Sequence, residues 1–314
     1  MKKIYSHEPV LYQEIIHALN PSSGGRYVDG TIGAGGHASG ILMACEPDGE
    51  LLGMDIDPQA VSLARQNLQK FGARVRIIPA SYTTLSSHLA EIGWEKINGM
   101  VLDLGASSMQ FDDPDRGFSF QVDSDLDMRF EPSNFINANK VVNDLSETEL
   151  ADLLFKYGEE PKSRQIARAI IQARPITGTV QLARVISSVY SSRGKIHPAT
   201  RSFQAIRIAV NDELKAIETV LPQAINALAP GGRLAVISFH SLEDRIAKSY
   251  FRQESRDCIC PPKQPVCTCG HKASVREINR RPIMASEEEI QRNPRARSAK
   301  LRIVEKLDKK NENH

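Results

Sequence analysis

A glycine-rich stretch, Asp29–His37 with the sequence DGTIGAGGH, places the strongest constraint on the fold of this chain. It follows a strand-like run at 26–28 and opens a helix-like run. Glycine is needed where the backbone must turn sharply and approach a ligand without a Cβ in the way. About twenty residues later, an apolar strand-like run ends on Asp55 within the sequence GMDID. Together these features predict a βαβ unit with a crevice that binds a nucleoside.

Strand-like and helix-like runs alternate along much of the chain. Strands are predicted at 26–29, 50–55, 74–79, 99–104, 233–239 and 300–307, and helices at 8–19, 37–44, 58–71 and 84–92. Such alternation indicates parallel strands joined by crossover helices that cover both faces of a sheet. We therefore predict a doubly wound, Rossmann-like α/β fold.

The alternation stops after Leu104. Helical patterns then follow one another at 147–157, 161–172 and 180–188 without a convincing buried strand, which indicates a helical insertion. The core resumes with a helical pattern at 202–228, before APGG turns the chain into the strand LAVISF. We predict three segments: residues 1–111 form the first part of the core, 112–198 the helical insertion that recognises the substrate, and 199–314 the second part of the core with a basic C-terminal segment.

Composition narrows the class of protein. The chain has 314 residues, and 40 Lys and Arg face 38 Asp and Glu, so a role with nucleic acid must rest on local basic patches. No stretch approaches the roughly 18 apolar residues of a membrane span, and five cysteines are few for a secreted disulfide framework. We expect a cytoplasmic protein with no membrane association.

The choice of nucleoside depends on Asp29. Gly33, Gly35 and Ala38 satisfy the dinucleotide pattern GxGxxG/A, which leaves an NAD-dependent dehydrogenase as an alternative. A carboxylate at the tip of the first strand, however, would repel the pyrophosphate of NAD. It can accept a hydrogen bond, directly or through water, from the ammonium group of S-adenosylmethionine (SAM). We therefore favour SAM, with Asp55 bonding the ribose hydroxyls.

His37 directly follows Gly35 and Gly36 at the start of the predicted helix. This position suggests contact of its backbone and side chain with the methionine end of SAM.

The fourth strand ends in LDLGASSMQFDD, residues 102–113. Ligands of open α/β sheets lie at the carboxyl ends of strands, so Asp103, Ser107, Ser108 and Gln110 should face the SAM methyl group. If the nucleophile is an exocyclic amine, oxygen acceptors can bond its N–H groups and later take the proton. We predict Asp103 and Ser107 as catalytic residues. The alternative is that Asp103 caps the following turn and the serines satisfy loop backbone.

The next segment, 112–131, contains seven Asp or Glu against two Arg. Its aromatic residues Phe118 and Phe120 lie near Arg116 and Arg129, a combination that could stack a splayed-out base. The excess of acid suits a lid beside a cationic cofactor better than a phosphate track. A simple structured loop is the alternative.

Three later segments suit RNA better. They are 197–214, 238–246 and 293–302, and the residues of interest are Arg201, Arg207, His240, Ser241, Glu243, Asp244, Arg295, Arg297, Lys300 and Arg302. The basic side chains could meet phosphate, and the 238–246 group follows the fifth strand to the crevice edge. The alternative for a charge run is a solvated face.

Four cysteines, Cys258, Cys260, Cys267 and Cys269, lie close together in the sequence CICPPKQPVCTCGH. Four thiolates could enclose a tetrahedral zinc ion, whereas CxC pairs in a short turn could equally hold free thiols or a labile disulfide. The sequence does not decide between these, and we assign no metal ligand.

The chain resembles a known family in motifs that run in order over nearly its whole length. They are HEPVL, DGTIGAGGH, LDLGASSMQ, RGFSF, LDMR, YGEE, HPATRSFQAIRIAVNDEL, SFHSLEDR and NPRARSAKLR. These resemble the RsmH/MraW family of bacterial small-subunit rRNA (cytosine-N4) methyltransferases. The resemblance implies a SAM-dependent enzyme that methylates the N4 amine of a decoding-centre cytosine in 16S rRNA, within a ribosomal particle.

The resemblance also implies a set of SAM contacts, which map onto Gly35, Gly36, His37, Asp55, Tyr82, Asp103 and Gln110. Tyr82 follows the third strand, where an aromatic ring can lie against the adenine. A non-catalytic RNA-binding assembly factor that keeps SAM for structure is a further alternative. The oligomeric state, including a homodimer, stays open.

Overall fold

The computed structural model describes residues 9–191, 197–262 and 264–308. The chain divides into two compact units. We call Met1–Gly105 with Lys215–His314 the sheet unit, and Ala106–Leu214 the helical unit. Glu8, where the first predicted helix begins, lies outside the described residues.

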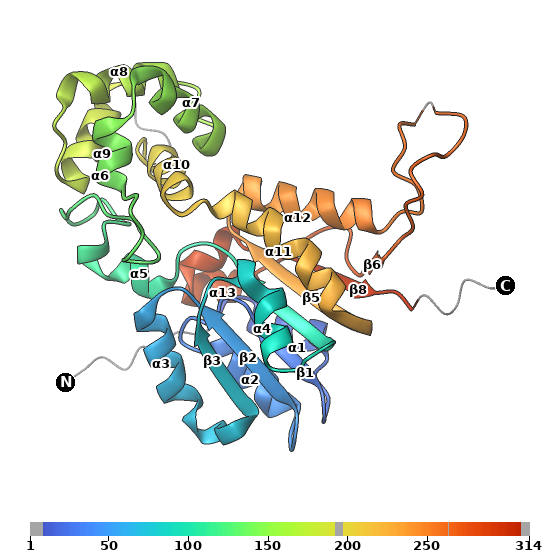
Figure 1. Ribbon diagram of the computed structural model, residues 1–314. Coiled ribbons are helices and arrows are strands. Elements are labelled where there is room, and N and C mark those ends of the chain that lie inside the picture. Colours follow the sequence, from blue (N-terminus) through green and yellow to red (C-terminus); the bar gives the residue numbers. More distant parts are fainter. Residues whose placement is uncertain (1–8, 192–196, 263, 309–314) are drawn as a thin grey trace. The chain divides into compact units, whose positions relative to one another are not determined.

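The sheet unit contains one mixed sheet, whose order over the described residues is β3-β2-β1-β4-β5-β8-β6, with β7 paired to β8 (Figure 1). Strands β1 to β5 pair in parallel, and β8 runs antiparallel to β5, β6 and β7. The bounds are β1 Arg26–Asp29, β2 Glu50–Asp55, β3 Val75–Pro79, β4 Ile97–Asp103, β5 Leu228–Ser238, β6 Val275–Glu277, β7 Ile283–Met284 and β8 Lys300–Lys306. The prediction of a doubly wound α/β fold is confirmed.

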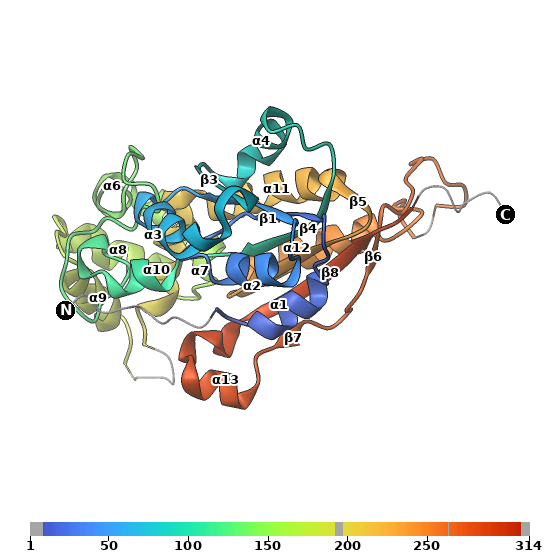
Figure 2. The ribbon, with the colours of Figure 1, turned by 90° about the horizontal axis from the view of Figure 1, so that it is seen from below.

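Helices cover both faces of this sheet, which explains why β2 and β4 are buried along most of their length. Along β2, Leu51 packs into one core cluster with residues of α1 and α2, and Leu52 into a second with residues of α4, α11 and α12. Figure 2 shows α1 and α2 on one side of the strands and α4 and α11 on the other. The helices of this unit are α1 Tyr12–Leu19, α2 Gly36–Ala44, α3 Pro58–Leu68, α4 Leu85–Glu91, α12 Ser241–Glu254 and α13 Glu287–Arg292, together with α11 Glu213–Ala227 from Lys215 onward.

Helix α3 shows how local chemistry sets an element. The Asp57 side chain accepts a hydrogen bond from Gln59 N–H at 3.0 Å, and Pro58 occupies the first helical position. The α-helix ends at Leu68, earlier than the predicted 71, and passes into a 3₁₀ segment, η1 Gln69–Arg74. Gly72 interrupts that segment with φ +57°, a conformation that glycine adopts readily.

The helical unit contains α5 Ser108–Asp112, α6 Ala138–Asp144, α7 Glu147–Gly158, α8 Ser163–Ala173, α9 Thr179–Ser188 and α10 Thr200–Asn211. Its core is a separate apolar cluster drawn from these helices and from the loop before α6. The predicted insertion, 112–198, lies inside this unit.

The structure differs from the sequence analysis at α10. The single helical pattern predicted at 202–228 corresponds to two helices, α10 and α11. Asp212 takes the left-handed conformation with φ +48° and ends α10. Phe203, Ile206 and Val210 of α10 pack into the helical cluster instead of the sheet cores. The apolar stripe was read correctly as helical, but its packing partner was not visible in the sequence.

None of the helices in the described ranges combines the length and apolarity that crossing a membrane requires.

Candidate active site

Three carboxylates end adjacent parallel strands of the sheet unit. Asp29 is the last residue of β1, Asp55 of β2 and Asp103 of β4. The sheet order places β1 between β2 and β4, and from there the chain proceeds outward in opposite directions. The carboxyl ends of β1 and β4 therefore form the switch point of the sheet, where ligands of doubly wound folds bind.

The glycine loop is tied to the second of these acids. Gly33 and Gly35 have φ of +51° and +86°, and Gly33 N–H donates to Asp55 Oδ2 at 3.0 Å. The other oxygen, Oδ1, accepts from Asp57 N–H at 2.9 Å. Each carboxylate oxygen can accept more than one hydrogen bond, so Asp55 can hold the loop and also accept from ribose hydroxyls.

The loop also packs closely against β4. A Cβ on Gly30 would lie 2.6 Å from Leu102 Cδ2 and 3.3 Å from Tyr82 Cβ. Tyr82 begins the 3₁₀ turn η2 Tyr82–Thr84 directly after β3 and is half-buried. The structure thus places Tyr82 beside the glycine loop, and its adenine contact stays a prediction.

Burial makes all three carboxylates reluctant to ionise. It raises the pKa of Asp29 to about 7, helped by the charge of Asp55 and opposed by N–H groups of Thr31 and Ala38. It raises the pKa of Asp55 to about 6, opposed by the N–H groups of Asp57 and Gly33. Ionising the carboxylates at the carboxyl ends of these strands therefore costs free energy.

Asp103 is the most perturbed of the three. Burial raises its pKa to about 8, and the charges of Asp29 and Glu243 add to the effect. Its backbone N–H donates to Thr31 Oγ1 at 2.7 Å, but its carboxylate Oδ1 is buried without a hydrogen-bond partner in the described structure. Buried polar atoms are normally satisfied, so this oxygen indicates a missing donor or cation. The alternative, in which the carboxylate caps the following turn, gains no support from this oxygen.

These residues fit SAM. Its sulfonium and ammonium groups are positive, and a positive charge near the three carboxylates lowers their pKa values and relieves the cost of ionising them. The phosphates of NAD would add negative charge to the same place. The electrostatics of the site thus favour the cationic nucleoside.

His37 has a packing role. It is buried in α2, its Nε2 lies 3.0 Å from Val10 O, and burial lowers its pKa to about 4. The ring is therefore neutral, donates to that carbonyl and stacks on Tyr12. Its backbone N–H, at the start of α2, remains the part proposed to contact the methionine end.

Ser107 and Gln110 belong to the helical unit, where they form a reciprocal capping box at the start of α5. Gln110 N–H donates to Ser107 Oγ at 3.3 Å, and Ser107 N–H donates to Gln110 Oε1 at 2.9 Å. The spacing S-x-x-Q is a sequence signature of this motif, so this role could have been predicted. The loop-satisfying alternative accounts for these bonds, and any contact with SAM is a proposal.

Several basic residues that were predicted to contact phosphate form ion pairs with carboxylates of the protein instead. The Arg207 guanidinium makes two bonds of 2.8 and 2.9 Å to the buried Glu213. Arg302 is buried and makes bonds of 2.6 and 3.2 Å to Asp244, which also lies 3.7 Å from Lys300 Nζ. For Arg207 and Arg302 the prediction of phosphate contact is wrong, because their guanidinium groups neutralise the carboxylates of the buried Glu213 and the half-buried Asp244.

Arg201 and Arg297 are exposed, and Arg295 is half-buried. These three remain candidates for contact with phosphate.

The predicted crevice-edge group at 238–246 starts α12. Glu243 is fully buried, and its Oε2 accepts from the N–H groups of Phe239 and His240 at 2.8 and 3.2 Å. Its charge also contributes to the raised pKa of Asp103. The group therefore anchors α12 and adds negative charge near the carboxyl end of β4.

The acidic segment 112–131 is a structured loop. Phe118 is buried with its ring 5.7 Å from that of Phe130, and Phe120 stacks 4.5 Å from His197. Arg116 donates to the carbonyls of Arg129 and Phe130. Phe118 is not available to stack a base, because its ring is part of the core, and the lid beside the cofactor stays a prediction.

Exposed aromatic residues lie elsewhere in the helical unit. Phe135 is 81% exposed, and Phe155 is 65% exposed. The sequence analysis missed both of them, because neither lies in a recognisable motif.

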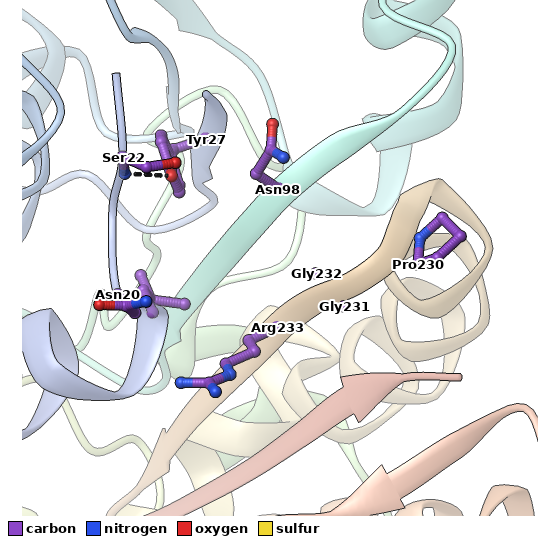
Figure 3. A pocket seen from close by; sticks show the side chains of 9 residues that line it. Asn20, Ser22, Tyr27, Asn98, Pro230, Gly231, Gly232 and Arg233 are labelled. Atoms are coloured by element: carbon purple, nitrogen blue, oxygen red, sulfur yellow. Dashed lines mark hydrogen bonds between the residues drawn. The ribbon is translucent and has the colours of Figure 1, made fainter. Parts of the chain in front are cut away.

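A pocket of about 230 Å³ lies at the other end of the strands, beside the amino ends of β1 and β4 (Figure 3). Its polar groups already serve the fold. Tyr27 OH accepts from Ser22 N–H at 2.8 Å, and Arg233 donates to Ala18 O and Glu305. None of the three carboxylates lines this pocket. Because ligands of this fold bind at the carboxyl ends of strands, we do not assign the pocket to the cofactor.

A doubly wound sheet whose switch point carries three acids that a bound cation would stabilise fits a SAM-dependent methyltransferase, and this is the class to which the protein belongs. Comparison with known families makes the assignment specific: the MraW methylase family matches residues 4–307, and the chain belongs to that family. The family resemblance found in the motifs is confirmed.

Similar proteins share nearly the whole chain. A ribosomal RNA small subunit methyltransferase H from Dehalococcoides mccartyi is 50% identical over 96% of this chain and 87% of its own length. Proteins of the same name are 46% identical in Heliobacterium mobile and 50% identical in Citrifermentans bemidjiense, each over 96% of this chain and 99% of their own length.

Proposed function

We propose that this protein transfers the methyl group of SAM to the N4 amine of a decoding-centre cytosine in 16S (small-subunit) rRNA. The names of its relatives support small-subunit rRNA as the substrate. The observation that carries the chemistry is the buried, unpartnered Oδ1 of Asp103 at the end of β4.

The chemistry asks for positioning and a proton acceptor. Bound SAM supplies a methyl group already activated on a positive sulfur. The protein must therefore hold the amine at attack distance and remove one proton from it. An amine conjugated to a pyrimidine ring has a delocalised lone pair, and an acceptor that bonds its N–H helps to localise it.

Asp103 is suited to that task. Its pKa of about 8 in the absence of cofactor lies near neutrality, the range in which a general base works best. The cofactor's positive charge lowers this pKa, so that the carboxylate is ionised when the amine arrives. The carboxylate then takes the amine proton and passes it to solvent. Ser107, four residues further along the chain, is the second proposed acceptor, through the same hydroxyl that caps α5.

We propose the helical unit as the part that recognises RNA. Phe135 is 81% exposed, with Lys140 Nζ 3.0 Å from the centroid of its ring. An exposed ring beside an ammonium group can stack a base while the cation attracts phosphate. Phe135→Ala is expected to weaken rRNA binding at least about fivefold, since stacking contributes about 1–3 kcal/mol per base, and to leave SAM affinity unchanged. The matched control is Met43→Ala, which truncates an exposed apolar residue of α2.

The reaction can be tested with purified protein, labelled SAM and small ribosomal subunits from a strain that lacks the protein. Nucleoside analysis should find the label in N4-methylated cytidine, and subunits from the wild-type strain should take up little label. Label in any other nucleoside would overturn the proposal. Label only on deproteinised rRNA would keep the reaction and reject the ribosomal particle as substrate.

The same substrate supports a cytoplasmic location for the protein, because ribosomal subunits assemble there. A non-catalytic assembly factor predicts that no label enters rRNA of either kind, although SAM binds.

A further inference from the structure

The loop between α12 and β6, residues 255–274, has no hydrophobic core of its own. Its larger apolar side chains are exposed, Ile259 by 44% and Val266 by 69%. No regular helix or strand occurs in the described part of this loop. In Figure 1 the loop extends far from the end of α12 before the chain returns to β6. Loops of this length in compact domains are uncommon, and small segments without a core are usually held by a disulfide or a metal.

The four cysteine sulfurs of this loop converge. Cys260 Sγ lies 4.0 Å from Cys267 Sγ, Cys267 Sγ lies 3.6 Å from Cys269 Sγ, and Cys269 Sγ lies 3.9 Å from Cys258 Sγ. All four lie within 4.8 Å of one another. Four sulfurs about 2.3 Å from one zinc ion in a tetrahedron would be about 3.8 Å apart. Disulfide sulfurs are about 2.05 Å apart, so these distances fit a shared ion and not two disulfides.

Backbone N–H groups point at these sulfurs. Thr268 N–H lies 3.5 Å from Cys260 Sγ, and the N–H groups of Ile259 and His271 each lie 3.5 Å from Cys269 Sγ. Donors around the sulfurs stabilise thiolates and orient them, as the outer partners of metal ligands do. Neutral free thiols give no comparable reason for three donors to converge.

His271, although close in sequence, is engaged elsewhere. Its Nδ1 lies 2.8 Å from Arg256 O, and its Nε2 lies 3.5 Å from Glu254 Oε1. The ligand set is therefore the four cysteines, two from each arm of the loop.

We propose that Cys258, Cys260, Cys267 and Cys269 bind one Zn²⁺ in a structural site. Four thiolates fill the tetrahedral coordination of zinc and leave no position for water or substrate, as in structural and not catalytic zinc sites. The thiols lose their protons on binding, and the ion orders a loop that the apolar core does not reach. The zinc proposal does not depend on the proposed methyl transfer, and the two are tested separately.

Metal analysis of the full-length protein, purified without a metal-affinity step, tests the site. About one zinc per chain is expected, falling at least about tenfold when the four cysteines are changed together to serine. Cys45→Ser is the matched control, because Cys45 is the remaining cysteine and is buried in the sheet unit, and it should keep the zinc. Absence of zinc, iron in its place, or zinc retained by the fourfold variant would overturn the proposal.

Two measurements on the unsubstituted chain guard against a variant that fails to fold. Cobalt(II) added to the zinc-depleted protein should give the absorption bands of tetrahedral thiolate coordination, and octahedral spectra would contradict the site. Hydrogen exchange at 255–274 should speed up when zinc is removed, while exchange in α1 and α2 stays the same. Unchanged exchange in the loop would reject the structural role.

Discussion

The replacement Asp103→Asn should stabilise the cofactor-free protein at alkaline pH. The pKa of Asp103 is about 8 in the folded protein against 3.8 for an ordinary aspartate, a rise of about four units. At about 1.4 kcal/mol per unit, the upper limit for the cost of ionising this group is about 6 kcal/mol. Neighbouring acids share the effect and Asp103 as a whole is only half-buried, so we expect about 2–4 kcal/mol.

The direction with pH follows from the raised pKa. The cost of ionising Asp103 is absent below about pH 4, grows as pH rises, and is complete above about pH 8. Asparagine cannot ionise and escapes this cost. Its advantage in unfolding free energy over the wild type should therefore grow between about pH 5 and about pH 8.5.

Urea unfolding of both proteins without cofactor, at these two pH values, measures the difference. Asp48→Asn is the control, because hydrogen bonds from Ser23 and Gly24 lower the pKa of Asp48. That group stabilises the protein above its ordinary pKa, so its replacement should cost stability at high pH. An Asp103→Asn advantage that does not change with pH, or a variant less stable than wild type at pH 8.5, would refute the reasoning.

Three further predictions concern the cofactor, an ion pair and a helix contact. SAM affinity should rise between about pH 6 and pH 8, with protons released in calorimetry, because the cation favours the ionised forms of acids whose pKa values are raised; a flat profile would contradict this. Asp244→Asn should lower the unfolding free energy by about 3 kcal/mol, because it leaves the buried Arg302 unpaired; a loss below about 0.5 kcal/mol in urea unfolding would count against it. Gly158→Ala should cost about 1–3 kcal/mol, since its Cβ would lie 2.7 Å from Arg201 O where α7 meets α10; thermal unfolding at wild-type temperature would show that the contact relaxes.

Short-range rules explain what the sequence could predict. Glycines at left-handed positions, the acids that end β1, β2 and β4, and a Pro at a helix start all act within a few residues. The positions of the glycine loop, of β1 and of β2 with Asp55 at its end were therefore predicted correctly, whereas the ribose contact of Asp55 stays a prediction. The capping box at Ser107 was equally local, and its spacing was visible.

Long-range packing explains the misses. Arg302 looks like a surface charge until the fold brings Asp244 against it from 58 residues away. Phe118 looks like a stacking platform until Phe130 covers it. The Asp103 environment also required the fold, because burial and neighbouring strands set its pKa. Charge and aromatic content alone cannot distinguish a buried pair from an exposed contact.

The most direct test of the account is a crystal structure of the protein with bound S-adenosylhomocysteine. The account predicts the ribose beside Asp55, with the ligand running along the glycine loop toward Asp103 at the carboxyl ends of β1, β2 and β4. Ligand density in the pocket lined by Asn20, Asn98 and Arg233, at the other end of the strands, would contradict it.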